Sequence, residues 1–545
     1  MLVLIAATFL RLYRYDLHDV INDEVFYGFR SIGLIDYLNS PYQPTPFEWF
    51  DPIPAWAKIS FHDHPILGFV IQNIFFKIFG VNLLGLRLPF ILAGIASVYL
   101  IYLVCRRLFE NETTGLLAAA VLAVNNYHIW ISRIGLQESL VIFFWLVAIW
   151  LFLKTLENFR YFYWTVAAVG FAILIKYTAV VLLPIFGVFL LLRRRDLLTW
   201  PRVIWASVIL LAIVSPIIIY NLNLYALRGH FDYQISYFLG QNVPEWQFRT
   251  GREAPGGFVQ RFQSIFLWFR EGYGLPFTAL FAVSLAVLLR SLKNWGAQFL
   301  GLSLLFITLL LFVIGPENRF FSVTAPFFAA VTAFGISKLF SGKALLVRAG
   351  WGILIVFLAW ESFYSINTYL AVSPLGREVW HYSRLRRDAN SWGYNQLEEY
   401  LNKTMAGYYP SLSFPLRYSF AKTFGEEARR RAKRDGKSPR EILFIYDTSF
   451  FNVSSLWYLT RRTIYDAWPV ITDGAYLSAV SADPGYFKNQ GIKEFVFLKA
   501  GDTLLDLHMP AASAVHIETE LQAKNLQPEI IKSKSGKNAF RVYKF

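Results

Sequence analysis

The sequence predicts a polytopic α-helical membrane protein that ends in an extracytoplasmic α/β domain. Of the 545 residues, 55% are hydrophobic and 18% are aromatic, and the mean hydropathy is +0.40. Soluble domains rarely stay this apolar over such a length, and several runs approach the roughly 20 residues that cross a bilayer. After about residue 370, charged residues become frequent, and short strand-like runs alternate with helix-like stretches. That alternation is typical of a small α/β domain.

About eleven apolar segments are expected to cross the membrane. They lie near 1–13, 86–104, 114–132, 138–153, 162–175, 177–192, 203–220, 273–290, 297–314, 320–339 and 350–367. If Met1 is cytoplasmic, strict alternation puts the basic clusters around Arg106, Arg193, Arg290 and Lys338 on the cytoplasmic side, as the positive-inside rule requires. The first segment offers only ten residues before Arg11, so we expect the natural chain to begin upstream of Met1.

Two domains follow from this topology. We expect a transmembrane catalytic module over 1–370, with external loops 14–66 and 221–272, and an extracytoplasmic α/β domain over 371–545. Within the latter, the strand-like runs lie at 442–446, 493–498 and 539–543. The formal charge is +15, and basic residues cluster between the apolar runs, which indicates membrane topology and not nucleic-acid binding. The single cysteine, Cys105, excludes a disulfide within the chain and a cysteine-ligated metal site.

Two polar clusters in the first external loop are the main candidates for chemistry. Adjacent carboxylates, Asp23 and Glu24, follow the first apolar segment, where charge is costly near hydrocarbon and usually faces water, a partner or a substrate. The alternative is a helix start whose acids complement the helix dipole. His62, Asp63 and His64 carry metal-ligand side chains, and an extended backbone would turn both histidines to one side. A hydrogen-bonded polar loop without metal is the alternative.

Three basic residues stand at the predicted external ends of spans, against the positive-inside trend: Arg133, Lys176 and Arg319. One such residue usually extends toward lipid headgroups. Three around one polytopic core favour a phosphate-binding site, where an arginine can hold phosphate with two parallel hydrogen bonds.

The order of these features resembles the GT-C glycosyltransferases of the protein O-mannosyltransferase family, which includes the lipid A aminoarabinose transferases. The resemblance runs from Arg11 to about Pro326. Its anchors, in order, are Arg-Leu-Tyr-Arg-Tyr-Asp at 11–16, Asp23-Glu24-x-x-Tyr27, His64-Pro65-x-Leu67, Phe79-Gly80, Arg87-Leu88-Pro89, Ser132-Arg133 with Glu138, Lys176-Tyr177-Thr178 with Pro184, and Asn318-Arg319-Phe320-Phe321 with Pro326.

The resemblance implies an inverting transfer of a sugar from a polyprenyl monophosphate to an envelope acceptor, which is a protein, a lipid or a glycan. Asp23 matches the family's external-loop aspartate, to which the role of base is assigned, and Glu24 would orient the loop or bind acceptor. Arg133, Lys176, Arg319 and His64 would lie near the leaving phosphate. Glu138, Tyr27 and Phe61 would contact sugar or acceptor.

A divalent metal is the one cofactor that the sequence suggests. Asp63 aligns with an acid that binds metal in the aminoarabinose transferases, and His62 would be a second ligand. Protein mannosyltransferases of the family are regarded as metal-independent. A lysine precedes the proline in the aminoarabinose enzymes, so His64 departs from that pattern, which argues against aminoarabinose as the donor sugar.

Two rival functions are considered. An oligosaccharyltransferase shares the fold and the lipid donor, but we find no Trp-Trp-Asp motif in the external domain. A transporter or flippase of lipid-linked sugars would show repeat symmetry and polar residues in mid-span. The expected location is a prokaryotic cytoplasmic membrane, because the beta-trefoil domain of eukaryotic protein mannosyltransferases is missing, with membrane lipid and no nucleic acid as partners.

Overall fold

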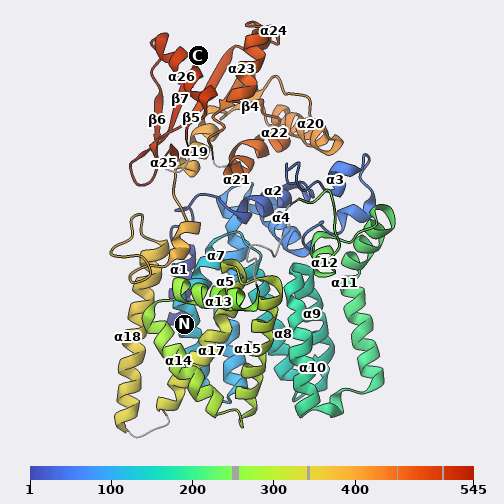
Figure 1. Ribbon diagram of the computed structural model, residues 1–545, viewed down its shortest axis with the longest axis vertical. Coiled ribbons are helices and arrows are strands. Elements are labelled where there is room, and N and C mark those ends of the chain that lie inside the picture. The colour runs from blue at the N-terminus through green and yellow to red at the C-terminus, as the bar shows by residue number, and fades with distance from the viewer. Residues whose placement is uncertain (248–256, 341–343, 451, 506–508) are drawn as a thin grey trace. The chain divides into compact units, whose positions relative to one another are not determined.

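The computed structural model describes residues 1–247, 257–340, 344–450, 452–505 and 509–545. The chain forms two compact units (Figure 1). We call Met1–Tyr15, Ser31–Phe47 and Ile53–Arg387 the helical unit, and Asp16–Arg30, Glu48–Pro52 and Asp388–Phe545 the α/β unit. The main boundary between the two units, at residues 387 and 388, lies close to the domain boundary expected at 370. The segment 16–30 nevertheless clusters with the C-terminal region, although the sequence suggested that it belongs to the transmembrane module.

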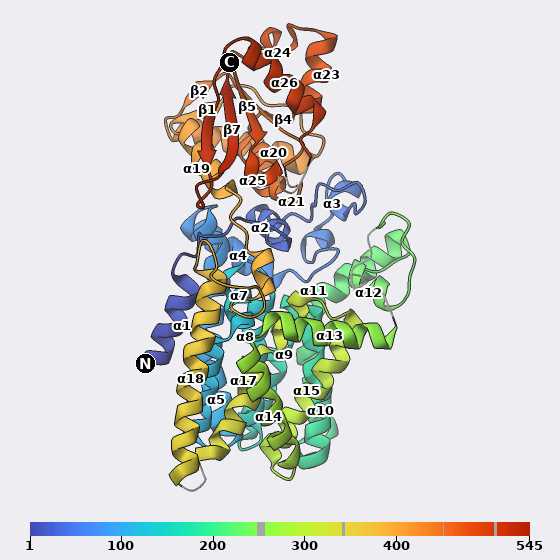
Figure 2. The same cartoon turned by 60° about the vertical axis from the view of Figure 1, so that its left-hand side comes forward.

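The helical unit consists of helices that run alongside one another (Figures 1 and 2). Their bounds are α1 (Leu2–Leu12), α4 (Leu67–Phe79), α5 (Leu83–Leu108), α6 (Glu112–Val124), α7 (Asn126–Arg133), α8 (Glu138–Thr155), α9 (Phe162–Ile175), α10 (Leu182–Arg193), α11 (Trp200–Arg228), α12 (Tyr233–Phe238), α13 (Phe258–Gly272), α14 (Leu275–Arg290), α15 (Trp295–Ile314), α16 (Asn318–Phe321), α17 (Ala325–Phe340) and α18 (Ala344–Tyr369). Short 3₁₀ turns join them at η1 (Ala55–Lys58), η2 (Phe159–Tyr161), η3 (Tyr177–Val181), η4 (Arg195–Leu197), η5 (Ser322–Thr324) and η6 (Arg384–Asp388), the last of which reaches into the α/β unit.

Every predicted apolar segment contains a helix, which confirms the helical membrane fold class. By length and composition, six described helices can cross a membrane alone, and seven can if the bent pair α6 and α7 is one span. The remaining predicted spans are shorter apolar helices, such as Leu2–Leu12 and Leu275–Arg290. The number of crossings therefore stays a prediction.

The span predicted at 114–132 is broken in the middle. Asn125 leaves the helical conformation, and its side chain accepts the N–H of His128 at 3.0 Å, which caps α7 at 59° to α6. The break frees carbonyl groups at the end of α6, and the buried Arg11 guanidinium donates to two of them, those of Ala123 at 3.0 Å and Leu122 at 3.1 Å. Buried carbonyls need such partners, so Arg11 stabilises the bend.

The loops expected at 14–66 and 221–272 contain further helices. The first holds α2 (Asp23–Gly33) and α3 (Pro46–Trp49). The second holds α12 and α13. Its residues 248–256, which include Gly251, Pro255 and Gly256, lie outside the described residues.

The α/β unit is built on a five-stranded mixed sheet of order β4-β3-β5-β7-β6. Its strands are β3 (Ile442–Tyr446), β4 (Val470–Thr472), β5 (Glu494–Ala500), β6 (Glu529–Lys532) and β7 (Asn538–Lys544), and a separate parallel pair joins β1 (Tyr408–Pro410) to β2 (Ser438–Arg440). β3 is parallel to β4 and β5, while β7 is antiparallel to β5 and β6. The three predicted strands are confirmed as β3, β5 and β7.

The helices of the α/β unit are α19 (Tyr394–Thr404), α20 (Ser419–Arg434), α21 (Asn452–Ser455), the π-helical η7 (Leu456–Thr460), α22 (Arg461–Asp466), α23 (Asp473–Ala482), α24 (Tyr486–Asn489), α25 (Asp502–Leu505) and α26 (Ala512–Ala523). Alternate residues of the central strands, such as Leu443 and Ile445, face one core with Phe487 of α24 and Ile517 of α26. This period of two is what a sheet covered by helices requires.

Candidate functional site

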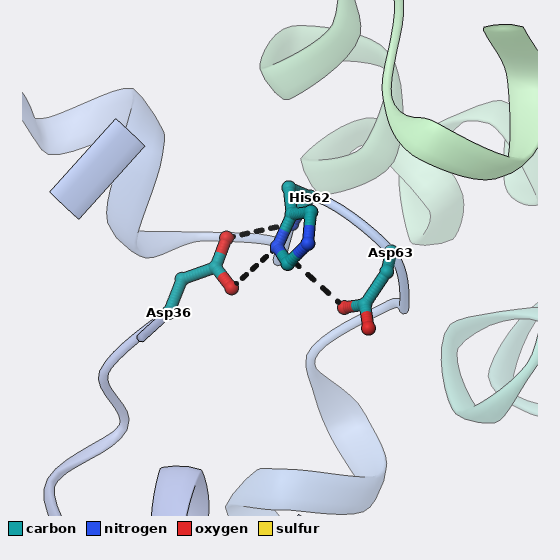
Figure 3. Close-up of side chains that lie close together, drawn as sticks. All are labelled: Asp36, His62 and Asp63. Carbon is teal, nitrogen blue, oxygen red and sulfur yellow. Dashed lines mark hydrogen bonds and ion pairs between the residues drawn. The ribbon is translucent and has the colours of Figure 1, made fainter. Parts of the chain in front are cut away.

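The polar loop of the helical unit gathers around His62. This fully buried side chain places Nδ1 2.7 Å from Asp36 Oδ1 and 3.8 Å from Asp63 Oδ1, while its backbone N–H donates to Asp36 Oδ2 at 2.7 Å (Figure 3). Asp63 also lies against His64, with 3.1 Å between Oδ2 and Nδ1. The structure thus brings the predicted His62, Asp63 and His64 together and adds Asp36. We call these four residues the acid–histidine cluster.

The donor set of this cluster fits a divalent metal ion. One atom each of Asp36, His62 and Asp63 lies within 4.8 Å of the others, and all three residues are buried. One imidazole and two carboxylates form a set that zinc and manganese accept. The same atoms also form a complete hydrogen-bonded network. If His62 Nδ1–H donates to Asp36, Nε2 accepts from the Gln43 amide at 2.8 Å, so a metal would have to displace the Nδ1 proton.

Lys176 and Glu138 form a buried ion pair. The ammonium donates to Glu138 Oε1 at 2.5 Å, and the two residues are 7% and 1% exposed. Glu138 begins α8 and Lys176 stands between α9 and η3, so each side chain leaves the end of a helix. Burying two charges is costly unless they are paired, so this contact fixes how the two helix ends meet.

Arg319 lies close to this pair through an aromatic ring. The Lys176 ammonium lies 5.0 Å from the centre of the Phe320 ring, and the Arg319 guanidinium carbon lies 4.7 Å from the same centre. Both contacts are cation–π interactions. Two of the four predicted phosphate ligands therefore converge on one ring. We call Lys176 and Arg319 the cation pair.

Two routes connect the cation pair with the acid–histidine cluster. Tyr177, next to Lys176, donates its hydroxyl to Asp232 Oδ2 at 2.5 Å, and the N–H of the following residue, Tyr233, donates to the His62 carbonyl at 2.6 Å. Burial raises the pKa of Asp232, although the N–H of Ile235 and the side chains of Tyr177 and Asn221 oppose that rise.

The second route runs through the start of α4. The Phe69 ring lies 6.3 Å from His64 and 4.3 Å from Phe61, and a methyl group at the neighbouring Gly68 would lie 3.1 Å from the side chain of Gln137, next to Glu138. Positions far apart in the sequence are thus connected within the helical unit by one hydrogen-bonded route and one packing route.

The Arg133 side chain binds backbone carbonyls, unlike Lys176 and Arg319, which lie against the Phe320 ring. Its guanidinium donates to four carbonyls at the end of α1: Leu10 at 2.9 Å, Arg11 at 3.2 Å, Tyr13 at 2.9 Å and Arg14 at 2.7 Å. The side chain is 5% exposed. These bonds satisfy helix-end carbonyls, which is a structural task. A contact between Arg133 and phosphate stays a prediction.

Asp23, Glu24 and Tyr27 belong to the α/β unit. Asp23 begins α2, as the helix-start alternative foresaw, and is half-buried, while Glu24 and Tyr27 are buried at 1% and 3% exposure. The segment that carries them is bound to the C-terminal region: Tyr458 accepts the N–H of Val20 at 2.8 Å, and Tyr465 donates to the carbonyl of Phe29 at 2.9 Å. The catalytic role of Asp23 stays a prediction.

Sequence reasoning missed Asp36 and Asp232. Asp36 follows α2 in a polar loop, and nothing in its local pattern separates it from other loop acids, since its partner His62 is 26 positions away. Asp232 carried a weak signal, because an aspartate three residues before an apolar position is typical of a helix cap, and it does cap α12 through the N–H of Ile235.

Comparisons with known proteins agree with this geometry. Residues 63–220, which include Asp63, Glu138 and Lys176, match the family model described as dolichyl-phosphate-mannose-protein mannosyltransferase. The chain is 28% identical over 168 residues to YkcB of Bacillus subtilis, named as a candidate mannosyltransferase, which covers 31% of this chain and 22% of the relative. It is 27% identical over 202 residues to YycA of the same organism, with the same kind of name, which covers 36% of this chain and 27% of YycA. The chain therefore matches less than a third of the length of these curated relatives.

The fold extends beyond the matched segment. The crystal structure of ArnT from Cupriavidus metallidurans bound to undecaprenyl phosphate superimposes with a TM-score of 0.53 at 12% identity, covering 100% of this chain and 97% of that one. At this identity the likeness shows the fold alone. The predicted resemblance to GT-C glycosyltransferases is therefore confirmed for the fold.

Proposed function

We propose that this chain is a membrane glycosyltransferase that moves a sugar from a polyprenyl monophosphate to an envelope acceptor, with inversion. The observation that carries the proposal is the convergence of Lys176 and Arg319 on the ring of Phe320, connected to the acid–histidine cluster. This arrangement lies in a fold shared with a protein that binds undecaprenyl phosphate, and Asp63, His64 and Lys176 lie in a segment that matches a mannosyltransferase family model.

The cation pair would neutralise the departing phosphate. When the bond between the sugar and the phosphate oxygen breaks, negative charge grows on the phosphate, and preorganised cations lower the energy of that state. Arg319 can offer two parallel N–H donors, while Lys176 supplies a point charge. Lys176 is held by Glu138 at 2.5 Å, so the phosphate would share that ammonium with the Glu138 carboxylate, which can in turn accept a hydroxyl of the sugar or acceptor.

Asp23 would take the proton of the attacking acceptor hydroxyl, which is the work of a general base. Glu24 would support the loop or bind acceptor. His64 would contact phosphate when it is protonated, and Tyr27 and Phe61 would contact sugar or the prenyl chain. Glu138 would likewise contact sugar or acceptor.

A divalent metal would be held by Asp36, His62 and Asp63, with the Gln43 amide next to the remaining imidazole nitrogen. When bound, it would supply positive charge near the phosphate. Metal analysis of the purified protein, with His62→Ala and Asp63→Asn as variants, tests this directly. We expect about one metal ion per wild-type chain and none in the variants. An equally low metal content in all three proteins would contradict a metal site and would mean that His62 serves only as a hydrogen-bonded residue.

The protein would work in a prokaryotic cytoplasmic membrane with the cluster and the α/β domain on the external side, where lipid-linked sugars meet envelope acceptors. The helices that can cross a membrane support the membrane location. The basic residues between apolar segments support the orientation.

The proposed activity is tested with purified full-length protein in lipid nanodiscs, radiolabelled polyprenyl-phosphate sugars and envelope extract. The wild type is compared with Asp23→Asn and Arg319→Gln, and Arg290→Gln is the matched control, because Arg290 is an exposed arginine at the end of α14. We expect kcat/KM to fall by about 100-fold or more in both site variants and to stay unchanged in the control.

The outcomes separate the rival functions. Release of polyprenyl phosphate that depends on Arg319 supports an enzyme. Full activity of Asp23→Asn removes Asp23 as base and directs attention to Glu24 and Glu138. Movement of intact lipid-linked sugar across the bilayer without release of polyprenyl phosphate contradicts the proposal in favour of a flippase. Transfer of a whole glycan to asparagine indicates an oligosaccharyltransferase.

A further inference from the structure

The α/β unit contains a hollow that the proposed transfer reaction does not use. Its volume is about 280 Å³, and it is lined by the end of α19, by β1, by α20, and by α22 with the residue Trp468 that follows it. Small-molecule sites usually measure about 300–1,000 Å³, so the hollow lies at the lower end of this size and suits a ligand of about one sugar ring.

Positive charge exceeds negative charge at the buried wall of this hollow. Arg461 and Arg462 are each 4% exposed, and both approach the same carboxylate oxygen of Glu398, at 2.5 Å and 3.7 Å. Arg462 lines the hollow, donates to Asn402 Oδ1 at 2.9 Å and lies 4.5 Å above the ring of Trp468. Burial, together with the charge of Arg461, lowers the pKa of Arg462 to about 10. An anion beside Arg462 would relieve this excess.

The outer wall adds further cations from α20 and the residues after it. Arg429, Arg431 and Lys437 line the hollow. Arg429 donates through Nη2 to the hydroxyl of Ser413, and its buried Nε has no hydrogen-bond partner among the described residues. The small residues Ala428 and Ala432 turn inward, which leaves the long basic side chains of the same helix around the opening.

Two carboxylates and an aromatic ring also line the hollow beside these cations. Asp435 and Asp466 line the hollow and are both exposed, and the charge of Asp466, like that of Glu398, partly balances the buried Arg462. Tyr408, which also lines it, is 43% exposed. Carboxylates repel a bare anion but accept hydrogen bonds from hydroxyl groups. An exposed aromatic ring offers a face to a sugar. The ligand that satisfies both sets of groups has one anionic group and several hydroxyls.

We propose that this hollow binds a phosphorylated sugar, with the phosphate at Arg462, Arg431 and Lys437 and the sugar hydroxyls at Asp435 and Asp466. Such a ligand is either a free sugar phosphate or the phosphorylated end of a larger glycan. This site is separate from the cation pair of the helical unit, and the proposal does not rest on the proposed glycosyl transfer.

Isothermal titration calorimetry with the full-length protein in nanodiscs tests the site without any turnover. The probes are glucose 6-phosphate, inorganic phosphate and glucose. We expect glucose 6-phosphate to bind at least tenfold more tightly than either of the others. The variant Arg431→Gln/Lys437→Gln, which changes two exposed side chains, should weaken this binding about tenfold or more, as expected for the loss of charge-assisted hydrogen bonds.

Two further variants sharpen the test. Arg430→Gln/Lys433→Gln removes the same charge from exposed positions of the same helix that do not line the hollow, and it should bind glucose 6-phosphate as the wild type does. Asp466→Ala should weaken the binding of glucose 6-phosphate but not of inorganic phosphate, because it removes the hydroxyl acceptor and a repulsive charge together. A phosphorylated oligosaccharide that binds more tightly than glucose 6-phosphate identifies a glycan end as the ligand, and equal affinity identifies the free sugar phosphate.

Three results overturn the proposal: no detectable binding of glucose 6-phosphate, equal affinity for inorganic phosphate, or equal loss in the Arg430→Gln/Lys433→Gln control. The last result would show that a general basic surface attracts anions. None of them bears on the transferase activity, which is measured separately.

Discussion

Asp19 is predicted to be the strongest single anchor of the segment that carries Asp23 and Glu24. Its side chain is buried at 2% exposure, and its two carboxylate oxygens accept the backbone N–H groups of Gly393 at 2.9 Å and Asn395 at 3.0 Å. These N–H groups stand at the start of α19, where no earlier turn of helix offers an acceptor. Asp19 thus caps a helix that begins 374 residues later in the chain.

The size of the effect follows from the two donors. Asp19→Ala leaves both N–H groups without an acceptor in a buried place, and each orphaned donor costs about 1–3 kcal/mol, so the loss of stability should be about 2–6 kcal/mol. Asp19→Asn keeps one acceptor oxygen and should lose about half of that. Burial raises the pKa of Asp19, although the N–H groups of Asn395 and Gly393 oppose that rise.

The sign of the resulting pH dependence is fixed by this raised pKa. The folded form holds the Asp19 proton more tightly than the unfolded chain. The stability that this tighter proton binding adds is therefore full below the unfolded pKa near 3.8, and it is lost as the pH rises through the folded pKa. Asp19→Asn should remove this dependence.

Thermal unfolding and limited proteolysis of the full-length protein measure the effect. Asp16→Ala is the matched control, because Asp16 lies in the same segment, is half exposed and pairs with Lys534 at 2.8 Å. An exposed pair of this kind is worth about 0–1 kcal/mol. If Asp19→Ala unfolds at the same temperature as Asp16→Ala, and is cleaved no faster near 16–30, then Asp19 is not the anchor and the reasoning is refuted.

Three further predictions concern charged side chains elsewhere. Glu138→Gln and Lys176→Met should each destabilise the protein by about 3–5 kcal/mol in thermal or detergent unfolding, whereas the double variant should lose less than the sum; additive losses would show that the pair is not coupled. Glu361→Gln should leave the unfolding midpoint unchanged or raise it, because both buried carboxylate oxygens lack a hydrogen-bond partner among the described residues, and a clear fall would contradict this. Burial raises the pKa of Glu518, but hydrogen bonds from Lys499 and Tyr543 outweigh that effect and the net pKa is lowered. The stability from Glu518 should therefore be present above about pH 4.5 and fall at lower pH, and an acid-unfolding curve that Glu518→Gln leaves unchanged would argue against it.

Much of the fold was predictable because it depends on local pattern. Long apolar runs gave the positions of helices such as α5 and α15, and the compact runs of branched and aromatic residues gave β3, β5 and β7. The strands β1, β2, β4 and β6 were missed, since three or four residues are too short to establish an alternating pattern. The helix α13 (FVQRFQSIFLWFREG) was missed because its mixed apolar and polar residues were assigned to the loop 221–272.

The sequence by itself determined which residue types were available for chemistry: paired carboxylates, a His-Asp-His run, and basic residues at unexpected ends of apolar segments. It did so because charge beside hydrocarbon is costly wherever the chain goes. Only the tertiary structure decided which of them meet. It paired Lys176 with Glu138, placed Lys176 and Arg319 against the same Phe320 ring, paired His62 with Asp36, and bonded Arg133 to carbonyls at the end of α1. The physical reason is that a side chain's partners are set by how helices pack, over distances that no local pattern records.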